Sequence, residues 1–246
     1  MSIRVLMHSF NSPEENLSAE EYLFNKKKQL DDRDEDILRI WESNTYFVVL
    51  GSSQSVLEEV FLDKCISNDI KVIRRCSAGG AVLQGPGCVN YSLFLNLNKH
   101  PQMRNIRNSY YLILSMLKKT LSEEYQLETK IEGISDLCYC SKKISGNAQR
   151  RNSSILLHHG TLLYDINFEL LENVLKIPKI QPLYRCGRRH REFVGTLPLK
   201  KKEIADCILK TFAMDSFSSS FSDLEIAEIS QLADIKYSKN EWNFKR

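Results

Sequence analysis

The order of apolar segments in the sequence predicts a mixed α+β fold, in which a mixed β-sheet forms the core and helices flank it. Short runs rich in branched and aromatic residues, which are typical of strands, occur along much of the chain. Longer segments with one apolar face lie between them, without the strict alternation of a doubly wound parallel sheet. At 246 residues the chain is long enough for one large domain or two small ones, and no internal repeat is visible.

An edge strand over residues 3–9 is expected to open the fold, followed by a helix over residues 16–30. The helix has its acids early and its lysines late, which is the distribution that the helix macrodipole favours. The acidic residues 31–36 then form a solvated loop. Further strands are expected at residues 37–41, 46–50, 72–75 and 89–97, with a helix at 56–68.

The clearest amphipathic helix of the sequence covers residues 109–124. Its apolar side is formed by Leu112, Ile113, Met116, Leu117 and Leu121. The elements expected next are strands at 128–131, 137–139, 142–149 and 154–164, and a helix at 169–175 that ends before Pro178. Two terminal helices, 201–214 and 223–236, are separated by the serine-rich residues 216–222.

Composition and charge argue against several classes of protein. A hydrophobic content of 42% fits a globular core, and a net charge of +3 beside 34 basic and 31 acidic residues does not indicate a nucleic-acid partner. The seven cysteines are scattered without a Cys-x-x-Cys pair, so we expect reduced thiols and no zinc site. No signal peptide or membrane span is visible, and we therefore expect a cytoplasmic protein without a membrane partner.

A glycine-rich segment, residues 74–82, begins at the end of an expected strand. It reads Arg-Arg-Cys-Ser-Ala-Gly-Gly-Ala-Val. Adjacent glycines let backbone N–H groups approach a ligand closely, and the two arginines suit carboxylate or phosphate oxygens. A tight turn without a ligand is the alternative. The spacing matches neither the dinucleotide-binding Gly-x-Gly-x-x-Gly nor the phosphate loop that ends in Lys-Ser/Thr.

A second segment, residues 142–150, is built around Lys143. A lysine among small and branched strand residues could point inward, where its ammonium needs a phosphate or carboxylate as partner. A solvated Lys-Lys pair is the alternative. His158 and His159 are neighbours on an expected strand, so at most one of them faces a site. Cys76 follows two arginines, but no feature of the sequence assigns it the base that a nucleophilic cysteine needs.

Together the two segments resemble the lipoate–protein ligase A family. That family's Arg-Arg-x-Ser-Gly-Gly-Gly-Ala-Val motif is matched by residues 74–82, with Ala78 in place of the first glycine. Its Lys-x-Ser-Gly-x-Ala motif is matched by residues 143–148, and its His-x-Gly-x-Leu segment is similar to residues 158–163. Three motifs in the right order make the resemblance specific.

Weaker matches extend the resemblance over roughly residues 1–200. Residues 16–21 resemble the family's early helix, and Asp136 resembles the aspartate of its Asn-Asp-Leu step, with Ser135 in place of the asparagine. The chain departs from the family at Gln84, where a histidine is usual. This departure and Ala78 could shift the substrate or slow its activation.

What the resemblance implies is a biotin/lipoate ligase-like fold, similar to class II synthetases, in a single catalytic domain over residues 1–246. It also implies two-step chemistry, in which ATP with Mg²⁺ activates lipoate to lipoyl-AMP and an acceptor lysine then takes the lipoyl group. The expected acceptors are lipoyl domains of 2-oxoacid dehydrogenase complexes or the glycine cleavage H protein. No separate C-terminal accessory domain is expected, so adenylation could need a separate accessory protein.

The resemblance assigns roles to individual residues. Lys143 would be catalytic, bridging the lipoate carboxyl and the α-phosphate, and Asp136 would position Lys143 or the ribose–phosphate end. The acyl tail would lie against Trp41 and Leu83. Lipoate and its adenylate would contact Trp41, Arg75, Ser77, Gly79, Gly80, Leu83, Asp136, Ala148, His159 and Thr161, and no metal ligand is expected.

Two other functions remain open. One is a lipoyl or octanoyl transferase that uses a supplied acyl donor, for which a nucleophilic cysteine is the discriminating feature. The other is a catalytically idle protein that binds lipoyl adenylate; Lys143 argues against it, because binding alone needs no charge at the reacting bond. A biotin–protein ligase fits less well, since its glycine-arginine biotin signature is missing. The strongly basic residues 184–194 could dock an acidic acceptor domain, with a solvated loop as the alternative.

Overall fold

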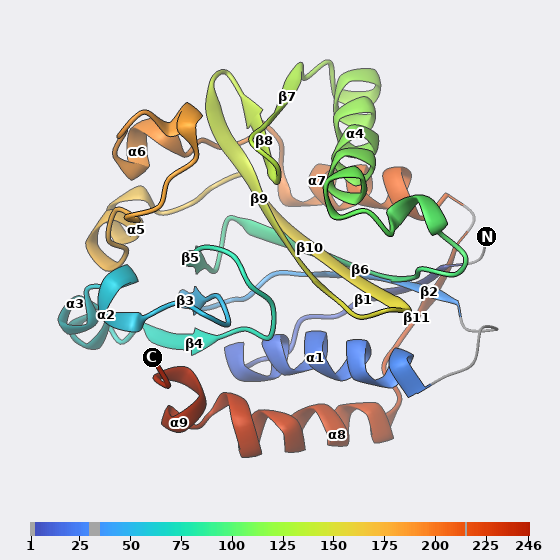
Figure 1. The fold of residues 1–246 in the computed structure, drawn as a ribbon, viewed down its shortest axis with the longest axis horizontal. Coiled ribbons are helices and arrows are strands. Elements are labelled where there is room, and N and C mark those ends of the chain that lie inside the picture. The colour runs from blue at the N-terminus through green and yellow to red at the C-terminus, as the bar shows by residue number, and fades with distance from the viewer. Residues whose placement is uncertain (1–2, 30–34, 215) are drawn as a thin grey trace.

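A computed structural model describes residues 3–29, 35–214 and 216–246, which form a larger and a smaller β-sheet with helices packed around them (Figure 1). The strands of the larger sheet are β1 (Ile3–Met7), β2 (Asp36–Trp41), β6 (Cys88–Asn96), β7 (Thr129–Glu132), β8 (Asp136–Tyr139), β9 (Lys142–Arg151), β10 (Ile155–Leu163) and β11 (Phe217–Ser219). Their order is β11-β1-β2-β6-β10-β9-β8-β7. Strand β1 pairs in parallel with β2 and β11 and the other neighbours are antiparallel, so the predicted mixed sheet is confirmed.

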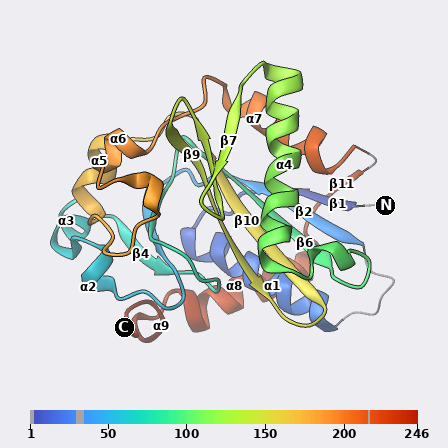
Figure 2. The ribbon, with the colours of Figure 1, turned by 45° about the horizontal axis from the view of Figure 1, so that its top comes forward.

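Helices cover both faces of the larger sheet. In Figure 1, α4 (Ile106–Tyr125) and α7 (Lys201–Phe212) lie above it, and α1 (Pro13–Gln29) and α8 (Asp223–Leu232) lie below it. Figure 2 shows α4 lying across strands β6 and β10. Each pair of helices buries its own apolar cluster against the sheet. Strand β6 is consequently buried along its whole length, as is expected of a strand covered on both faces.

The smaller sheet lies beside the larger one, at the left of Figure 1. It consists of β4 (Lys71–Arg74), β3 (Phe47–Leu50) and β5 (Val82–Gln84), in that order. Helices α2 (Val56–Glu59), α3 (Leu62–Ser67) and α5 (Phe168–Val174) enclose its apolar side chains in a separate cluster. The remaining short elements are η1 (Pro101–Met103), η2 (Leu183–Arg185), α6 (His190–Phe193), the π-helix η3 (Ala233–Tyr237) and α9 (Asn240–Asn243).

Helix α4 is the predicted amphipathic helix, and it is longer than expected. Its N-cap Asn105 accepts a hydrogen bond from the backbone of Asn108, which explains the start at Ile106. Leu114, which is not on the predicted apolar side, is buried in the core, whereas Met116 is 44% exposed. The apolar stripe is therefore rotated slightly from the predicted one.

Other expectations are corrected by tertiary contacts. Strand β1 is not at the edge, because β11, within the serine-rich residues 216–222, pairs outside it. The expected helix 56–68 is split into α2 and α3, because Val60 forms a β-bridge with Leu175 and the Phe61 N–H donates to the Val174 carbonyl at 2.9 Å. Most of the expected loop 31–36 lies outside the described residues, as does residue 30 of the expected first helix, and β2 begins at residue 36.

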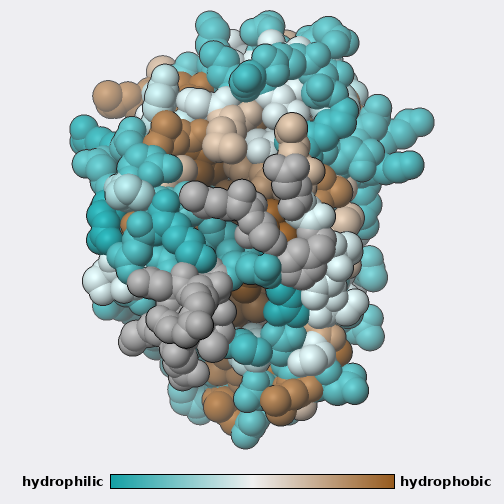
Figure 3. Space-filling view, turned by 90° about the vertical axis from the view of Figure 1, so that its right-hand side faces the viewer, coloured by the Kyte–Doolittle hydropathy of each residue, from teal (hydrophilic) through white to brown (hydrophobic). Residues whose placement is uncertain are grey.

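The surface at the far end from the smaller sheet is largely polar. Figure 3 shows hydrophilic residues over most of the top and the right edge of this face, with hydrophobic residues between them and along the bottom. Across residues 3–29, 35–214 and 216–246, no helix combines the length and hydropathy that a membrane crossing requires.

Candidate active site

Two adjoining cavities meet at Lys143. The smaller has a volume of about 190 Å³ and the larger a volume of about 1060 Å³. The predicted residues that line both are Gly79, Gly80, Asp136, Lys143 and Thr161. Those that line only the smaller cavity are Trp41, Arg75, Ser77, Ala148 and His159, and Leu83 lines only the larger. The structure thus gathers the predicted residues around one junction, but it places Leu83 apart from Trp41.

Strand pairing brings together the motifs that are distant in the sequence. Strands β9 and β10 are antiparallel, and their register places His159 opposite Ala148 and Thr161 opposite Gly146. The glycine-rich segment connects β4 to β5 and faces these strands across the cavity. Strand pairing therefore fixes the spacing of the site residues on β9 and β10, and the glycine-rich segment supplies Arg75 and Ser77 from the opposite wall.

Lys143 is held by a carboxylate and that carboxylate by a phenol. The Lys143 Nζ lies 2.9 Å from Asp136 Oδ1, and the Tyr184 hydroxyl donates to Asp136 Oδ2 at 2.6 Å. Burial and the Asp136 charge raise the pKa of Tyr184, so the phenol stays protonated as a donor. Sequence reasoning did not single out Tyr184, because its contact joins two residues 48 positions apart.

Arg75 forms the centre of the glycine-rich segment. Its guanidinium donates to Ser77 Oγ at 3.0 Å and to the carbonyls of Ala78 and Gly80 at 2.7 and 3.0 Å. A Cβ on Gly79, whose φ is +104°, would lie 2.7 Å from Arg75 Nη2, so glycine is required there. Burial lowers the pKa of Arg75 to about 10, and the described residues place no carboxylate within 4.0 Å of it. This buried positive charge is available to an anionic ligand.

The two histidines of β10 face different surroundings. His159 Nε2 lies 2.6 Å from Ser77 Oγ, and burial together with the charge of Arg75 lowers the pKa of His159 well below its usual value. His158 is enclosed, and its Nδ1 accepts from Gln149 Nε2 at 3.0 Å. Burial lowers the pKa of His158 to about 3. One histidine faces the cavity, and it is neutral.

Gln84, at the position where the resembling family usually has a histidine, lines both cavities. Its Nε2 donates to Thr161 Oγ1 at 2.8 Å, and Thr161 in turn donates to Asn90 Oδ1 at 2.6 Å. Trp41 closes the smaller cavity. The smaller cavity therefore has both polar and apolar walls, and the Trp41 indole N–H is a buried donor without a partner among the described residues.

Arg74, the first residue of the motif, binds backbone carbonyls and does not line the cavity. Its guanidinium donates to the carbonyls of Gly51 and Gln54 at 2.8 and 2.7 Å. It also donates to the carbonyls of Trp242 and Asn243 at 3.1 and 2.9 Å. Of the two arginines expected to bind an anion, only Arg75 lines the cavity, and Arg74 joins the C-terminal segment to strand β4.

The basic residues 184–194 are not uniformly solvated. Arg185 is buried, and its guanidinium lies 4.6 Å from the centre of the Phe193 ring. Arg188 donates to the carbonyls of Ser141 and Tyr184 at 2.9 and 2.8 Å. Arg185 and Arg188 therefore make contacts within the segment, and Arg188 also joins it to the turn before β9.

Cys76, the cysteine of the glycine-rich segment, is not an activated nucleophile. All seven cysteines of the chain are free in the structure. Cys76 lines the smaller cavity, and burial raises its pKa. Within the described part of the chain no group of three or more His, Cys, Asp or Glu side chains is placed to hold a metal ion.

A mixed sheet that places a lysine at the junction of two cavities, beneath a glycine-rich segment, has the arrangement of motifs expected of the lipoate ligase class. The chain belongs to the lipoyl protein ligase A/B catalytic domain family, whose model matches residues 12–211.

Individual relatives agree with this family. The chain is 26% identical to lipoate-protein ligase A of Psychrobacter cryohalolentis over 235 residues, covering 96% of this chain and 65% of the relative. It is 25% identical to octanoyltransferase LipM of Brevibacillus brevis over 240 residues, covering 84% and 85%. The bipartite lipoate protein ligase of Thermoplasma acidophilum has the same fold, with a TM-score of 0.84 at 23% identity over 99% and 96% of the two chains. The chain spans between 40% and 72% of the length of the curated lipoate–protein ligases that it resembles.

Proposed function

We propose that this chain is the catalytic domain of a lipoate–protein ligase, which activates lipoate with ATP and transfers the lipoyl group to an acceptor lysine. The observation that carries the proposal is the position of the Lys143 ammonium where two cavities meet. Apolar side chains such as Leu17, Val49 and Leu157 line the smaller cavity and suit the acyl chain of lipoate. The larger cavity has room for a nucleotide. The carboxyl group of lipoate and the α-phosphate of the nucleotide would then meet at Lys143.

The charges of the reaction explain this arrangement. In the first step a lipoate oxygen bonds to the α-phosphorus and the bond to the β-phosphate oxygen breaks, releasing pyrophosphate. In the second step the neutral amine of the acceptor lysine bonds to the acyl carbon, AMP leaves with the electron pair of the broken bond, and the amine releases a proton. Negative charge grows beside Lys143 in both steps, and its ammonium would stabilise that charge. Arg75 would add a fixed positive potential to the wall of the smaller cavity.

Mg²⁺ enters this proposal as part of the substrate Mg·ATP. It keeps most of its bonds to phosphate oxygens and water and needs at most one or two carboxylates. Glu58, Glu59 and Glu132 lie on the wall of the larger cavity and could supply one.

The proposed acceptor is a lipoyl domain, either of a 2-oxoacid dehydrogenase complex or of the glycine cleavage H protein. Support comes from the Thermoplasma acidophilum ligase, which was studied with its E2 lipoyl domain. The free cysteines support a reducing compartment, and we propose the cytoplasm.

The test measures the mass of a lipoyl domain after incubation with this chain, Mg²⁺, ATP and lipoate, in parallel with preformed lipoyl-AMP. A mass increase of one lipoyl group in both reactions supports a self-sufficient ligase. An increase with lipoyl-AMP alone assigns the chain to transfer and requires an accessory protein for activation. No increase in either reaction refutes the proposal.

Replacement of the central cation provides the first specific prediction. We expect Lys143→Ala to slow transfer from lipoyl-AMP by at least about a hundredfold, because it removes the charge that stabilises the transition state. Its melting temperature should stay close to that of the wild type, since Lys143 is 26% exposed. Wild-type transfer by this variant would refute the catalytic role of Lys143.

Octanoyl transfer through a cysteine is the second candidate, favoured by the similarity to LipM along most of both chains. The raised pKa of Cys76 opposes it, because a nucleophilic thiol needs a depressed pKa. The variant with Cys76, Cys138 and Cys140 all replaced by serine should keep its transfer activity. Complete loss of activity in this variant, with the fold intact, would favour the transferase.

A further inference from the structure

We propose that Tyr184 is a positioning residue for Lys143, and that the arginine-rich residues 184–194 hold Tyr184 in place. The inference rests on the proposed function of Lys143. The Tyr184 hydroxyl does not touch Lys143 but acts through Asp136, which accepts from both at 2.6 and 2.9 Å. All three residues line the larger cavity, beside the point where the two cavities meet.

The phenol limits how Asp136 can hold the lysine. A carboxylate has two oxygens, and with both of them free it can bind an ammonium more closely and from either side. Tyr184 occupies Oδ2, so Lys143 is left with Oδ1 alone. Asp136 is 7% exposed, and water therefore competes weakly for either oxygen. The arrangement orients Lys143 toward the cavity without binding it so tightly that a ligand oxygen could not share it.

The arginines of the segment fix the Tyr184 backbone and ring. Arg188 donates to the Tyr184 carbonyl at 2.8 Å and to the Ser141 carbonyl, in the turn between β8 and β9, at 2.9 Å. The Tyr184 ring packs on Phe193 with the ring centres 5.2 Å apart, and Arg185 lies over the same Phe193 ring. Positive charge in this segment thus serves to fold it.

The segment is also joined to the strand that carries Lys143. Val194 forms a parallel β-bridge with Lys143, and the Gly195 N–H donates to the Lys143 carbonyl at 2.9 Å. The side chain of Lys142 donates to the Arg191 carbonyl at 3.1 Å. Figures 1 and 2 show α6 next to strand β9. Tyr184 and Lys143 therefore belong to one continuous piece of structure.

The first test compares Tyr184→Phe with Tyr125→Phe in single-turnover transfer from preformed lipoyl-AMP to a lipoyl domain. Tyr125 is a matched control, because its hydroxyl donates to the Glu203 carbonyl between α4 and α7. We expect Tyr184→Phe to slow transfer about tenfold, with little change in the dissociation constant of lipoyl-AMP. Tyr125→Phe should transfer at the wild-type rate. Equal rates for the two variants, or a loss in Tyr184→Phe that is confined to lipoyl-AMP affinity, would overturn the proposal.

The second test separates folding of the segment from docking of the acceptor. Arg188→Ala and Arg189→Ala each remove one positive charge, but only Arg188 contacts the Tyr184 carbonyl, and Arg189 is exposed. At low salt we expect only the Arg188→Ala variant to transfer the lipoyl group more slowly than the wild type. An equal loss from both variants would assign the arginines to acceptor docking and overturn their role in holding Tyr184.

A third readout does not depend on ligase activity. Acetic anhydride labels neutral lysine side chains, and mass spectrometry reports Lys143 and the neighbouring Lys142 separately. In Tyr184→Phe both Asp136 oxygens are free to hold Lys143, so its labelling should slow several-fold relative to Lys142. Unchanged relative labelling contradicts the coupling. If the wild-type chain transfers no lipoyl group, the proposed function fails, and this measurement still decides whether Tyr184 controls Lys143.

Discussion

Gly146 lies beside the Lys143 side chain on strand β9, and its missing side chain leaves the space that the ammonium occupies. A Cβ at Gly146 would lie 2.8 Å from both Nζ and Cε of Lys143. The lysine chain is flexible, so a methyl group would displace it rather than disrupt the backbone. Glycine weakens a strand interior, and alanine at this position should therefore not destabilise the fold.

We expect Gly146→Ala to reduce transfer from lipoyl-AMP by about a hundredfold, because displacement of a catalytic group by 1 Å has effects of this size. The melting temperature should stay the same or rise. Single-turnover transfer and thermal unfolding measured on the same preparation check both expectations. A variant that keeps the wild-type rate would mean that Lys143 works from a different position.

At the same scale, several of the site residues that the sequence predicts share one property. Arg75, Lys143 and His159 belong to short motifs, where spacing along the chain largely sets spacing in the fold. Leu83 is expected at the acyl tail with Trp41, yet the two line different cavities, because successive residues of a strand point to opposite faces. Val82 and Gln84 line the smaller cavity, whereas Leu83 packs into the apolar cluster under α2, α3 and α5. Tyr184 could not be found in this way, since only the folded segment brings its hydroxyl to Asp136.

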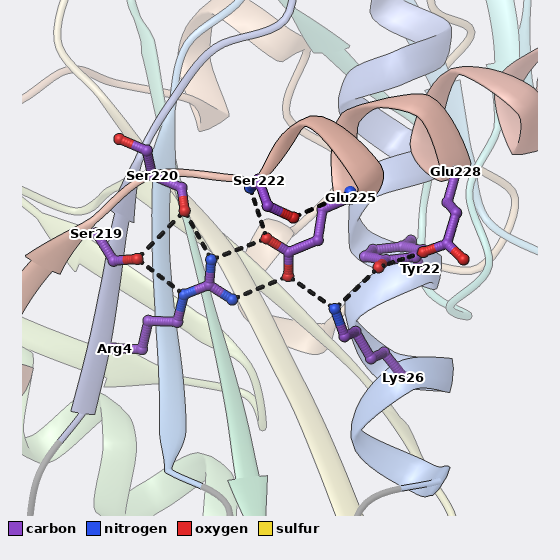
Figure 4. A network of polar contacts seen from close by, with 8 residues as sticks. All are labelled: Arg4, Tyr22, Lys26, Ser219, Ser220, Ser222, Glu225 and Glu228. Atoms are coloured by element: carbon purple, nitrogen blue, oxygen red, sulfur yellow. Dashed lines mark hydrogen bonds and ion pairs between the residues drawn. The ribbon is translucent and has the colours of Figure 1, made fainter.

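Helix α8 is fastened to α1 and β1 through one carboxylate, shown in Figure 4. Glu225 accepts from both Nη atoms of Arg4 at 3.0 Å and from Lys26 Nζ at 3.0 Å. Burial acts to raise the pKa of Glu225, but hydrogen bonds from Arg4, Ser222 and Lys26 outweigh it and lower the pKa to about 2. The unperturbed pKa of a glutamate is about 4.3, so the folded state favours the ionised form of Glu225.

We expect Glu225→Gln to lower the free energy of unfolding by about 2 kcal/mol at neutral pH, since it replaces charge-assisted hydrogen bonds by neutral ones. Because the pKa is depressed in the folded state, this contribution is present above about pH 5 and is lost as the pH falls toward about 2. Melting temperatures of the two proteins should therefore converge as the pH falls through this window. Glu228→Gln is the control: Glu228 is exposed and bonded to Tyr22 alone in this network, so its effect should be small. A constant difference at all pH values would contradict the assignment.

Among whole elements, prediction succeeded where a pattern was long. Strands β6, β9 and β10 and helices α1, α4, α7 and α8 carry enough residues for their period to be seen. The three-residue strand β5 and the four-residue helices α6 and α9 are too short to show a period along the sequence. In residues 56–68 the helical pattern was real, but the bridge from Val60 to Leu175 interrupts it. Contacts of this kind are not visible along the sequence.

In the whole molecule, residues 240–246 reach strand β4, which leads into the glycine-rich segment. Residues 240–246 pack against strand β4, where Arg74 donates to two of their carbonyls and the Trp242 indole donates back to the Arg74 carbonyl at 2.8 Å. Arg74 immediately precedes Arg75, which shapes the segment above the smaller cavity. The C-terminal residues therefore help to set the backbone on which the candidate site is built.

Asn243 joins this C-terminal contact at two points. Its Oδ1 accepts from the Arg74 N–H at 2.9 Å and its Nδ2 donates to the Tyr237 carbonyl at 2.7 Å. We expect Asn243→Ala to lower the free energy of unfolding by about 2 kcal/mol, because both backbone groups are left buried without a partner. Lipoyl-AMP should also bind several-fold more weakly, since the strand that leads into Arg75 loses a constraint. Calorimetric binding and denaturant unfolding measure the two effects, with Asn240→Ala as the control, because Asn240 is exposed in the same short helix. If Asn243→Ala matched this control in both measurements, the C-terminal residues would have no part in positioning the site.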